Sequence, residues 1–259
     1  MIFLLLALAV GLMALPLVTS PAPTEGHIRP SGFNSVGVLV GFVITVAVAT
    51  LTSPMFGFGF VFAVLLHELG SALAVRIIGH DVARVRLVPL PFMAAPRSDR
   101  PFDHALEESF AALYAPALAI PPMIIGFGLF HVLAPIAPGI ANVLRVMAIM
   151  LGTFNFLMLL PFLPFGGGRV VQSVSDAFWP QLRTFVTLFM SAAFASAALR
   201  DHSIAMAILA VAGFQSLFHR RRPAQERLTH NQALLVMSCY AFVLTVHFTG
   251  GFWLLTGLL

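Results

Sequence analysis

A histidine and a glutamate stand side by side within one of the most apolar stretches of the sequence. His67 and Glu68 lie near the middle of the run from Phe58 to Ile78. Two adjacent ionisable groups at membrane depth are costly to bury, and such residues generally mark a functional site. An imidazole can bind a metal ion, and a carboxylate can act as a general base. The pair therefore predicts a site, and packing against polar groups of other helices is the competing interpretation.

A second distinctive stretch overlaps the end of the apolar run from Ile140 to Phe162. It begins at Asn155, continues through the prolines of segment 160–164, and ends in three consecutive glycines, 166–168. The glycines allow two interpretations. One is a flexible backbone that a substrate can approach closely, and the other is the C-terminal end of a helix.

Together, the two stretches resemble the motifs of the site-2 protease family, the intramembrane zinc metalloproteases. His67-Glu68-Leu69-Gly70 resembles the start of the HExxH motif, in which two histidines bind Zn²⁺ and the glutamate is the general base. Segment 155–169 resembles the family's Asn…Leu-Pro-x-x-Pro-Leu-Asp-Gly-Gly stretch, whose aspartate is the third ligand. The resemblance implies that Glu68 is the catalytic base and that His67 is a metal ligand. It also implies binding roles for three further residues, Asn155, Gly167 and Gly168.

Two of the three metal-ligand positions are substituted in this chain. Ser71 stands where the second histidine of the motif would be, and Gly166 stands where the aspartate would be. A catalytic zinc site normally has three protein ligands and a water molecule. We therefore expect that zinc, the cofactor of the family, is not bound by this sequence. A rebuilt site is the alternative, with ligands from the following loop, namely His80, Asp81, Asp99, Asp103 and His104.

The composition predicts an all-α, multi-pass membrane protein with a site-2 protease-like core. The chain is 59% hydrophobic and 9% charged, whereas soluble domains average about 25% charged residues. The loop Gly79–Glu108 contains a short alternating segment, 82–88, that predicts a β-element. About eight apolar segments are long enough, or nearly so, to span a bilayer: Ile2–Thr19, Ser35–Leu51, Phe58–Ile78, Ser109–Leu133, Ile140–Phe162, Leu182–Leu199, Ile204–Phe218 and Ala233–Leu258.

The distribution of arginine predicts the orientation of these segments. If all eight span, twelve of the 14 basic residues lie on one side, Arg200 lies on the other and Arg145 lies within a span. The positive-inside rule then makes the Arg-rich loops cytoplasmic and places both termini outside, in what we expect to be a bacterial inner membrane. This distribution favours a first segment that is retained over a cleaved signal peptide. It also makes nucleic acid an unlikely explanation of the basic charge. His131 and His247 are expected near the ends of spans.

The sequence divides into N-terminal membrane segments (1–57), the site-2 protease-like core (58–176) and C-terminal membrane segments (177–259). Three functions remain open. The first is a catalytically degenerate family member that binds or regulates a membrane protein partner. The second is an active zinc protease that cleaves transmembrane or membrane-proximal peptide bonds. The third is a transporter-like protein that uses Glu68 as a proton-linked carboxylate.

Overall fold

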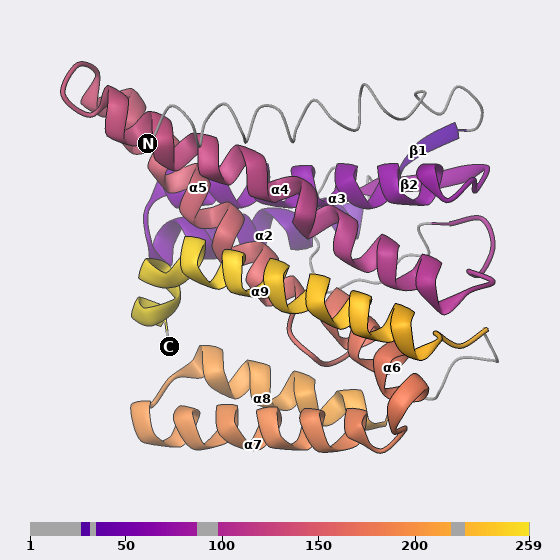
Figure 1. The fold of residues 1–259 in the computed structure, drawn as a ribbon. Helices are drawn as coiled ribbons and strands as arrows, with labels where there is room; N and C mark the ends of the chain where they lie inside the picture. The colour runs from indigo at the N-terminus through magenta and orange to yellow at the C-terminus, as the bar shows by residue number, and fades with distance from the viewer. Residues whose placement is uncertain (1–26, 32–34, 87–97, 219–225, 259) are drawn as a thin grey trace.

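Helices make up nearly all of the regular structure in the computed structural model of the chain (Figure 1). The structure describes residues 27–31, 35–86, 98–218 and 226–258. The first apolar segment, Ile2–Thr19, and the question of its cleavage lie outside these residues. The described elements are β1 (His27–Ser31), α2 (Ser35–Leu51), α3 (Pro54–Ile77), β2 (Val82–Arg86), α4 (Ala105–Leu133), α5 (Pro138–Met158), α6 (Gly166–Phe178), α7 (Leu182–Asp201), α8 (Ile204–Leu217) and α9 (His230–Leu258).

Seven of these helices match apolar segments of the sequence, and several begin earlier than hydropathy alone suggests. Pro54 and Pro138 open α3 and α5, where the fixed φ of proline suits a first helical turn and its missing N–H costs nothing. At the start of α4, His104 and Glu107 form a capping box. This box satisfies backbone donors that have no partner within the helix.

Five of the described helices, α3, α4, α5, α7 and α9, are long and apolar enough to cross a membrane. This confirms the prediction of a helical protein with several segments that are able to span a membrane. α2 and α8 are shorter, with 17 and 14 residues. At 1.5 Å per residue, a helix of 14 residues reaches about 21 Å, less than the roughly 30 Å hydrocarbon core.

The β-element expected after the third segment is present as β2. It pairs in parallel with β1, from His27 opposite Val82 to Ser31 opposite Arg86. The sequence signal was the alternation of apolar and charged residues in β2. The partner strand was not anticipated, because β1 contains a proline and lies far from β2 in the sequence.

The centre of the bundle consists of α3, α4 and α5, which pack on one another, with α9 lying across α5 (Figure 1). Glycines permit the close crossing of α5 and α9. A Cβ added at Gly152 would lie 2.4 Å from the backbone nitrogen of Gly251. Small residues of this kind let helix backbones approach closely in membranes.

The two ends of the bundle differ. At the end that we call the sheet end, the β-sheet and α6 gather, α3 ends, and α4, α7 and α9 begin (Figure 1). At the opposite end, here the far end, α3 and α5 begin and α4 and α9 end. α7 and α8 pack on each other as a hairpin beside this bundle.

Candidate functional site

His67 forms a buried hydrogen bond between two central helices. Its Nδ1 lies 2.8 Å from Oδ1 of Asn155 on α5, and its ring meets the edge of Phe154 at a centroid distance of 5.4 Å. The Nδ2 of Asn155 donates to the Leu151 carbonyl at 2.9 Å, which orients Oδ1 toward the histidine. Because Oδ1 can only accept, Nδ1 of a neutral His67 carries the proton. Nε2 is then the nitrogen with a lone pair, as in a metal-ligating histidine.

Glu68 and Ser71 are buried on the same helix as His67, with 5% and 3% of their surfaces exposed. Ser71 follows His67 by four residues, so the two side chains lie on one face of α3. On that side α3 approaches α4 closely, since a Cβ at Gly70 would lie 2.9 Å from the Cα of Ala115. The positions of the HExxH-like motif therefore lie inside the bundle, at the contact of α3 with α4 and α5.

Gly166 lies close to this contact, although it is almost 100 residues from His67 in the sequence. A Cβ at Gly166 would lie 3.3 Å from the Ala112 carbonyl oxygen on α4 and 3.4 Å from the Met158 carbonyl oxygen on α5. Ala112 precedes Ala115 by three residues, and Met158 follows Asn155 by three. Three residues rise about 4.5 Å along a helix. The neighbours of position 166 on α4 and α5 are thus each about one helical turn from a residue that contacts the His67–Ser71 segment.

The three glycines differ in the space around them. At Gly167 an added Cβ would lie 1.9 Å from the Leu159 carbonyl oxygen, and at Gly168 it would lie 2.3 Å from the Phe162 carbonyl carbon. A side chain at either position would collide with backbone, whereas at Gly166 the neighbours need to move by only a few tenths of an ångström. Among the three, position 166 alone can accept a side chain without a large backbone shift.

Of the two interpretations of the glycines from sequence, the C-terminal end of a helix is wrong, and the close approach of a substrate stays a prediction. The glycines form the first turn of α6, and the backbone that approaches them is the chain's own turn at 159–163. The helix itself was missed in the sequence, because α6 is amphipathic and short and begins with glycines. Such residues usually end a helix.

Side chains of distant helices hold the turn that precedes α6. The Oη of Tyr240 on α9 donates to the Leu159 carbonyl at 2.7 Å. The backbone N–H of Leu163 donates to Oγ of Ser216 on α8 at 2.9 Å. These bonds satisfy polar groups in an apolar surrounding, where an unpaired group is costly. They also join the turn, which immediately precedes position 166, to α9 and α8, and neither was apparent from the sequence.

The residues at the three positions that the resemblance assigns to metal ligands do not fit a zinc ion. His67 supplies an imidazole, but the hydroxyl of Ser71 is a poor ligand at neutral pH and Gly166 has no side chain. Zinc sites are built from thiolate, imidazole and carboxylate groups. Glu68 is buried near these positions, and as a general base it has no metal-activated water to act on in this donor set.

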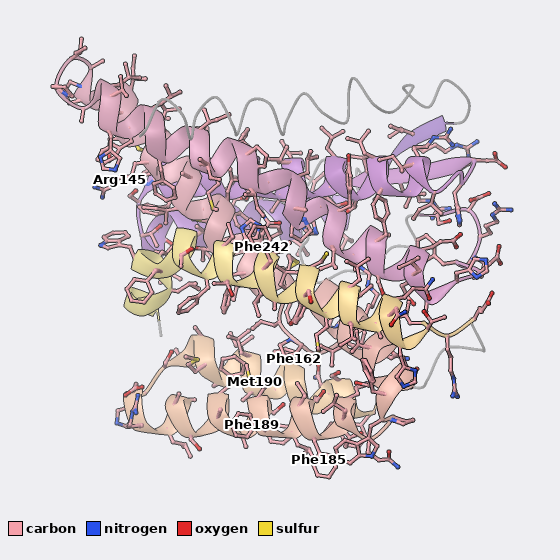
Figure 2. All side chains as sticks on the ribbon, viewed as in Figure 1. Arg145, Phe162, Phe185, Phe189, Met190 and Phe242 are labelled. Carbon is pink, nitrogen blue, oxygen red and sulfur yellow. The ribbon has the colours of Figure 1, made fainter. Side chains whose placement is uncertain are left out.

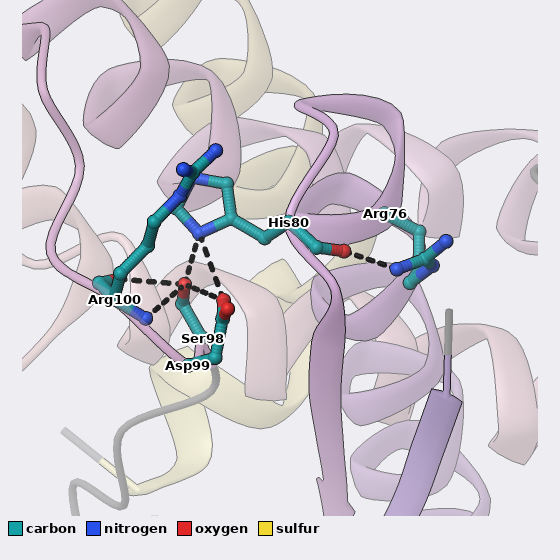
Figure 3. Close-up of polar contacts among 5 residues, drawn as sticks. All are labelled: Arg76, His80, Ser98, Asp99 and Arg100. Carbon is teal, nitrogen blue, oxygen red and sulfur yellow. Dashed lines mark hydrogen bonds and ion pairs between the residues drawn. The ribbon is translucent and has the colours of Figure 1, made fainter. Parts of the chain in front are cut away.

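Of the loop residues considered as substitute ligands, His80 and Asp99 lie together, but the described residues add no third ligand to them. Nδ1 of His80 contacts the Ser98 hydroxyl and lies 3.5 Å from Oδ1 of Asp99, as Figure 3 shows. Nδ1 of His104 instead lies 2.7 Å from Oε2 of Glu226. Within the described residues, no group of three or more His, Cys, Asp or Glu side chains could hold a metal ion. His80 instead joins the end of α3 to the loop, and its carbonyl accepts a hydrogen bond from Arg76.

His247 is not at the end of a span, as the sequence suggested. It lies within α9 and is fully buried, and its Nε2 donates to the Pro116 carbonyl on α4 at 2.8 Å. Pro116 also removes the N–H that would bond the Ala112 carbonyl in a regular helix. The Ala112 carbonyl, which loses this helical hydrogen bond, is also the nearest neighbour of a Cβ added at position 166.

Comparison of this chain with family models, with curated proteins and with solved structures finds no match. The functional argument therefore rests on the geometry described above.

The hydrogen bond between His67 and Asn155 should contribute measurably to stability. We expect Asn155→Leu to lower the free energy of unfolding by about 1–3 kcal/mol, because the buried Nδ1–H of His67 then loses its acceptor. Thermal unfolding in detergent measures the effect. Asn142→Leu on the same helix is the control, since Asn142 is exposed, and it should change stability by less than about 0.5 kcal/mol. Equal effects of both variants would contradict a role for the bond.

Proposed function

We propose that this protein is a catalytically degenerate member of the site-2 protease family that binds or regulates a membrane protein partner. It keeps the first ligand, His67, and the general base, Glu68, of the family motif. It lacks the ligands at Ser71 and Gly166. The alternative is an active zinc-dependent intramembrane protease, and the donor set at these positions argues against it.

The observation that carries the proposal is the position of Gly166. It lies one helical turn from the residues that contact His67 and Gly70, along both α4 and α5. The contrast with Gly167 and Gly168 adds independent support. Position 166 has room for a side chain where the family has aspartate, and the next two positions have none where the family has glycine. A common fold accounts for both features.

An apolar groove beside this site supports the binding of a partner. It has a volume of about 550 Å³ and is lined by residues of α5, α6, α7 and α9. Leu160 and Pro161, in the turn before α6, form part of its wall, and Phe185, Phe189 and Met190 line it along α7 (Figure 2). An apolar helix of another membrane protein matches this lining chemically. In this proposal the Arg-rich sheet end faces the cytoplasm of a bacterial cell.

Zinc content tests the loss of catalysis. We expect the purified protein to hold far less than one zinc ion per chain, even when zinc is supplied during expression, because one good ligand does not make a site. Metal analysis by mass spectrometry gives the stoichiometry. About one tightly held zinc ion per chain would contradict degeneracy and favour the active protease.

Site-specific photo-crosslinking tests the groove. A crosslinking amino acid at Val186, which lines the groove, should give a discrete product with a membrane protein in cells. The matched control is Val43 on α2, which is exposed on another side of the bundle and should crosslink only to lipid. The same products from both positions would count against a partner in the groove.

A further inference from the structure

An arginine lies within the membrane-spanning part of α5, near the far end of the bundle (Figure 2). Arg145 follows the first residue of α5 by seven positions, which places it about 10 Å along the helix. Its guanidinium carbon lies 5.5 Å from the ring centroid of Phe130 on α4 and 5.8 Å from that of Trp253 on α9. The ring of Trp253 in turn stacks on Phe56 of α3. Four helices thus converge on this charge.

The two aromatic rings cannot accept the in-plane hydrogen bonds of the arginine. A cation–π contact uses the face of the guanidinium, whereas its five N–H donors lie at the edge. Within the described part of the chain, Arg145 has no ion pair, and its Nε is buried without a hydrogen-bond partner. A buried donor without an acceptor is costly. Among the described residues, the site therefore has no anion.

No acidic side chain of the described residues can supply that anion. Asp201 is the acidic residue at the far end, and both of its carboxylate oxygens are bonded to Arg200, at 2.9 and 2.8 Å. The other described acidic residues lie within α3 at Glu68 or toward the sheet end. The described residues therefore supply no acidic partner for Arg145, and an anion of another molecule fits the site.

We propose that Arg145, flanked by Phe130 and Trp253, binds the phosphate of a phospholipid headgroup in the leaflet at the far end. Arginine near a membrane surface extends its charged end toward the headgroups, and its planar fork matches phosphate oxygens. Tryptophan is enriched at the same depth. Arg145 is only partly buried, so a headgroup can reach the edge of its guanidinium. This lipid joins α4, α5 and α9 at the end remote from His67.

Lipid binding to the purified protein in a neutral detergent tests the proposal. The probes are phosphatidylglycerol, a diacylglycerol with the same acyl chains, and inorganic phosphate, and the readouts are lipid retention in native mass spectrometry and the shift in melting temperature. We expect phosphatidylglycerol to be retained and to raise the melting temperature, and the other two to do neither. This comparison uses the unaltered protein, so it does not depend on any variant folding.

Two substitutions locate the site. Arg145→Gln should weaken retention of phosphatidylglycerol about tenfold or more, the effect of losing a charged hydrogen bond. Arg200→Gln removes a charge at the same end and should leave retention unchanged. Equal retention of both lipids by the unaltered protein, or undiminished retention by Arg145→Gln, would overturn the proposal. Stabilisation by inorganic phosphate as large as that by the lipid would show a small-anion site and overturn the lipid as its source.

Discussion

The double variant Ser71→His and Gly166→Asp should bind about one zinc ion per chain, whereas the natural sequence should not. The substitutions add an imidazole four residues from His67 and a carboxylate one helical turn from the contacts of α3 with α4 and α5. Asn155 already holds His67 in the tautomer whose Nε2 can bind a metal. Three ligands of these types are what a catalytic zinc site requires.

The charges around position 166 make the stability of a variant with aspartate there depend on zinc. An aspartate there stands in the first turn of α6, where the helix dipole favours a negative charge. It also lies beside the carbonyl oxygens of Ala112 and Met158, which repel a carboxylate unless a cation is present. We therefore expect Gly166→Asp to be destabilised without zinc. Zinc at about 100 times its Kd adds about 2.7 kcal/mol to the stability of the double variant.

Metal analysis and thermal unfolding with and without a chelator measure these effects. The single variants are the controls, since each has only two ligands and should bind zinc far more weakly. A double variant that is folded but holds no zinc would count against the relation of positions 67, 71 and 166 to one site. Restored cleavage of a membrane-spanning peptide, lost again with Glu68→Gln, would further support Glu68 as the general base.

The second large effect is expected from single methyl groups at the start of α6. Gly168→Ala places a Cβ 2.3 Å from the carbonyl carbon of Phe162, and Gly167→Ala places one 1.9 Å from the carbonyl oxygen of Leu159. Backbone atoms cannot rotate away as a side chain can. We expect the free energy of unfolding of each variant to fall by about 3 kcal/mol or more, because the turn must shift as a whole. This is the upper end of the usual cost of overpacking.

Gly166→Ala is the matched control for these variants. Its Cβ meets two carbonyl oxygens at 3.3 and 3.4 Å, a tight contact that small movements relieve. Alanine also stabilises a helix by up to about 1 kcal/mol relative to glycine. The two effects oppose each other, so we expect a net change within about 1 kcal/mol. Denaturation in detergent would show the contrast, and a similar loss in all three variants would argue against the close approach of the turn.

Local residue chemistry and hydropathy were enough to predict most of the helices. α2, α3, α4, α5, α7, α8 and α9 correspond to apolar segments, because a chain in lipid must form long apolar helices to satisfy its backbone. The short strand β2 was also predicted, from alternation within a few residues. α6 was missed because its starting glycines signal an end, and only the packing of segment 159–163 against them explains their presence.

In the candidate site too, some features follow from the sequence and others only from the tertiary structure. The sequence by itself determined which groups are available: an imidazole and a carboxylate at His67 and Glu68, and no strong ligand at Ser71 or Gly166. Tertiary structure decided which of them meet. The bond from His67 to Asn155 and the burial of His247 against Pro116 join residues 88 and 131 positions apart. The approach of Gly166 to Ala112 likewise joins α6 to a distant part of the sequence on α4. Contacts of this kind depend on how whole helices pack, and local residue patterns do not record them.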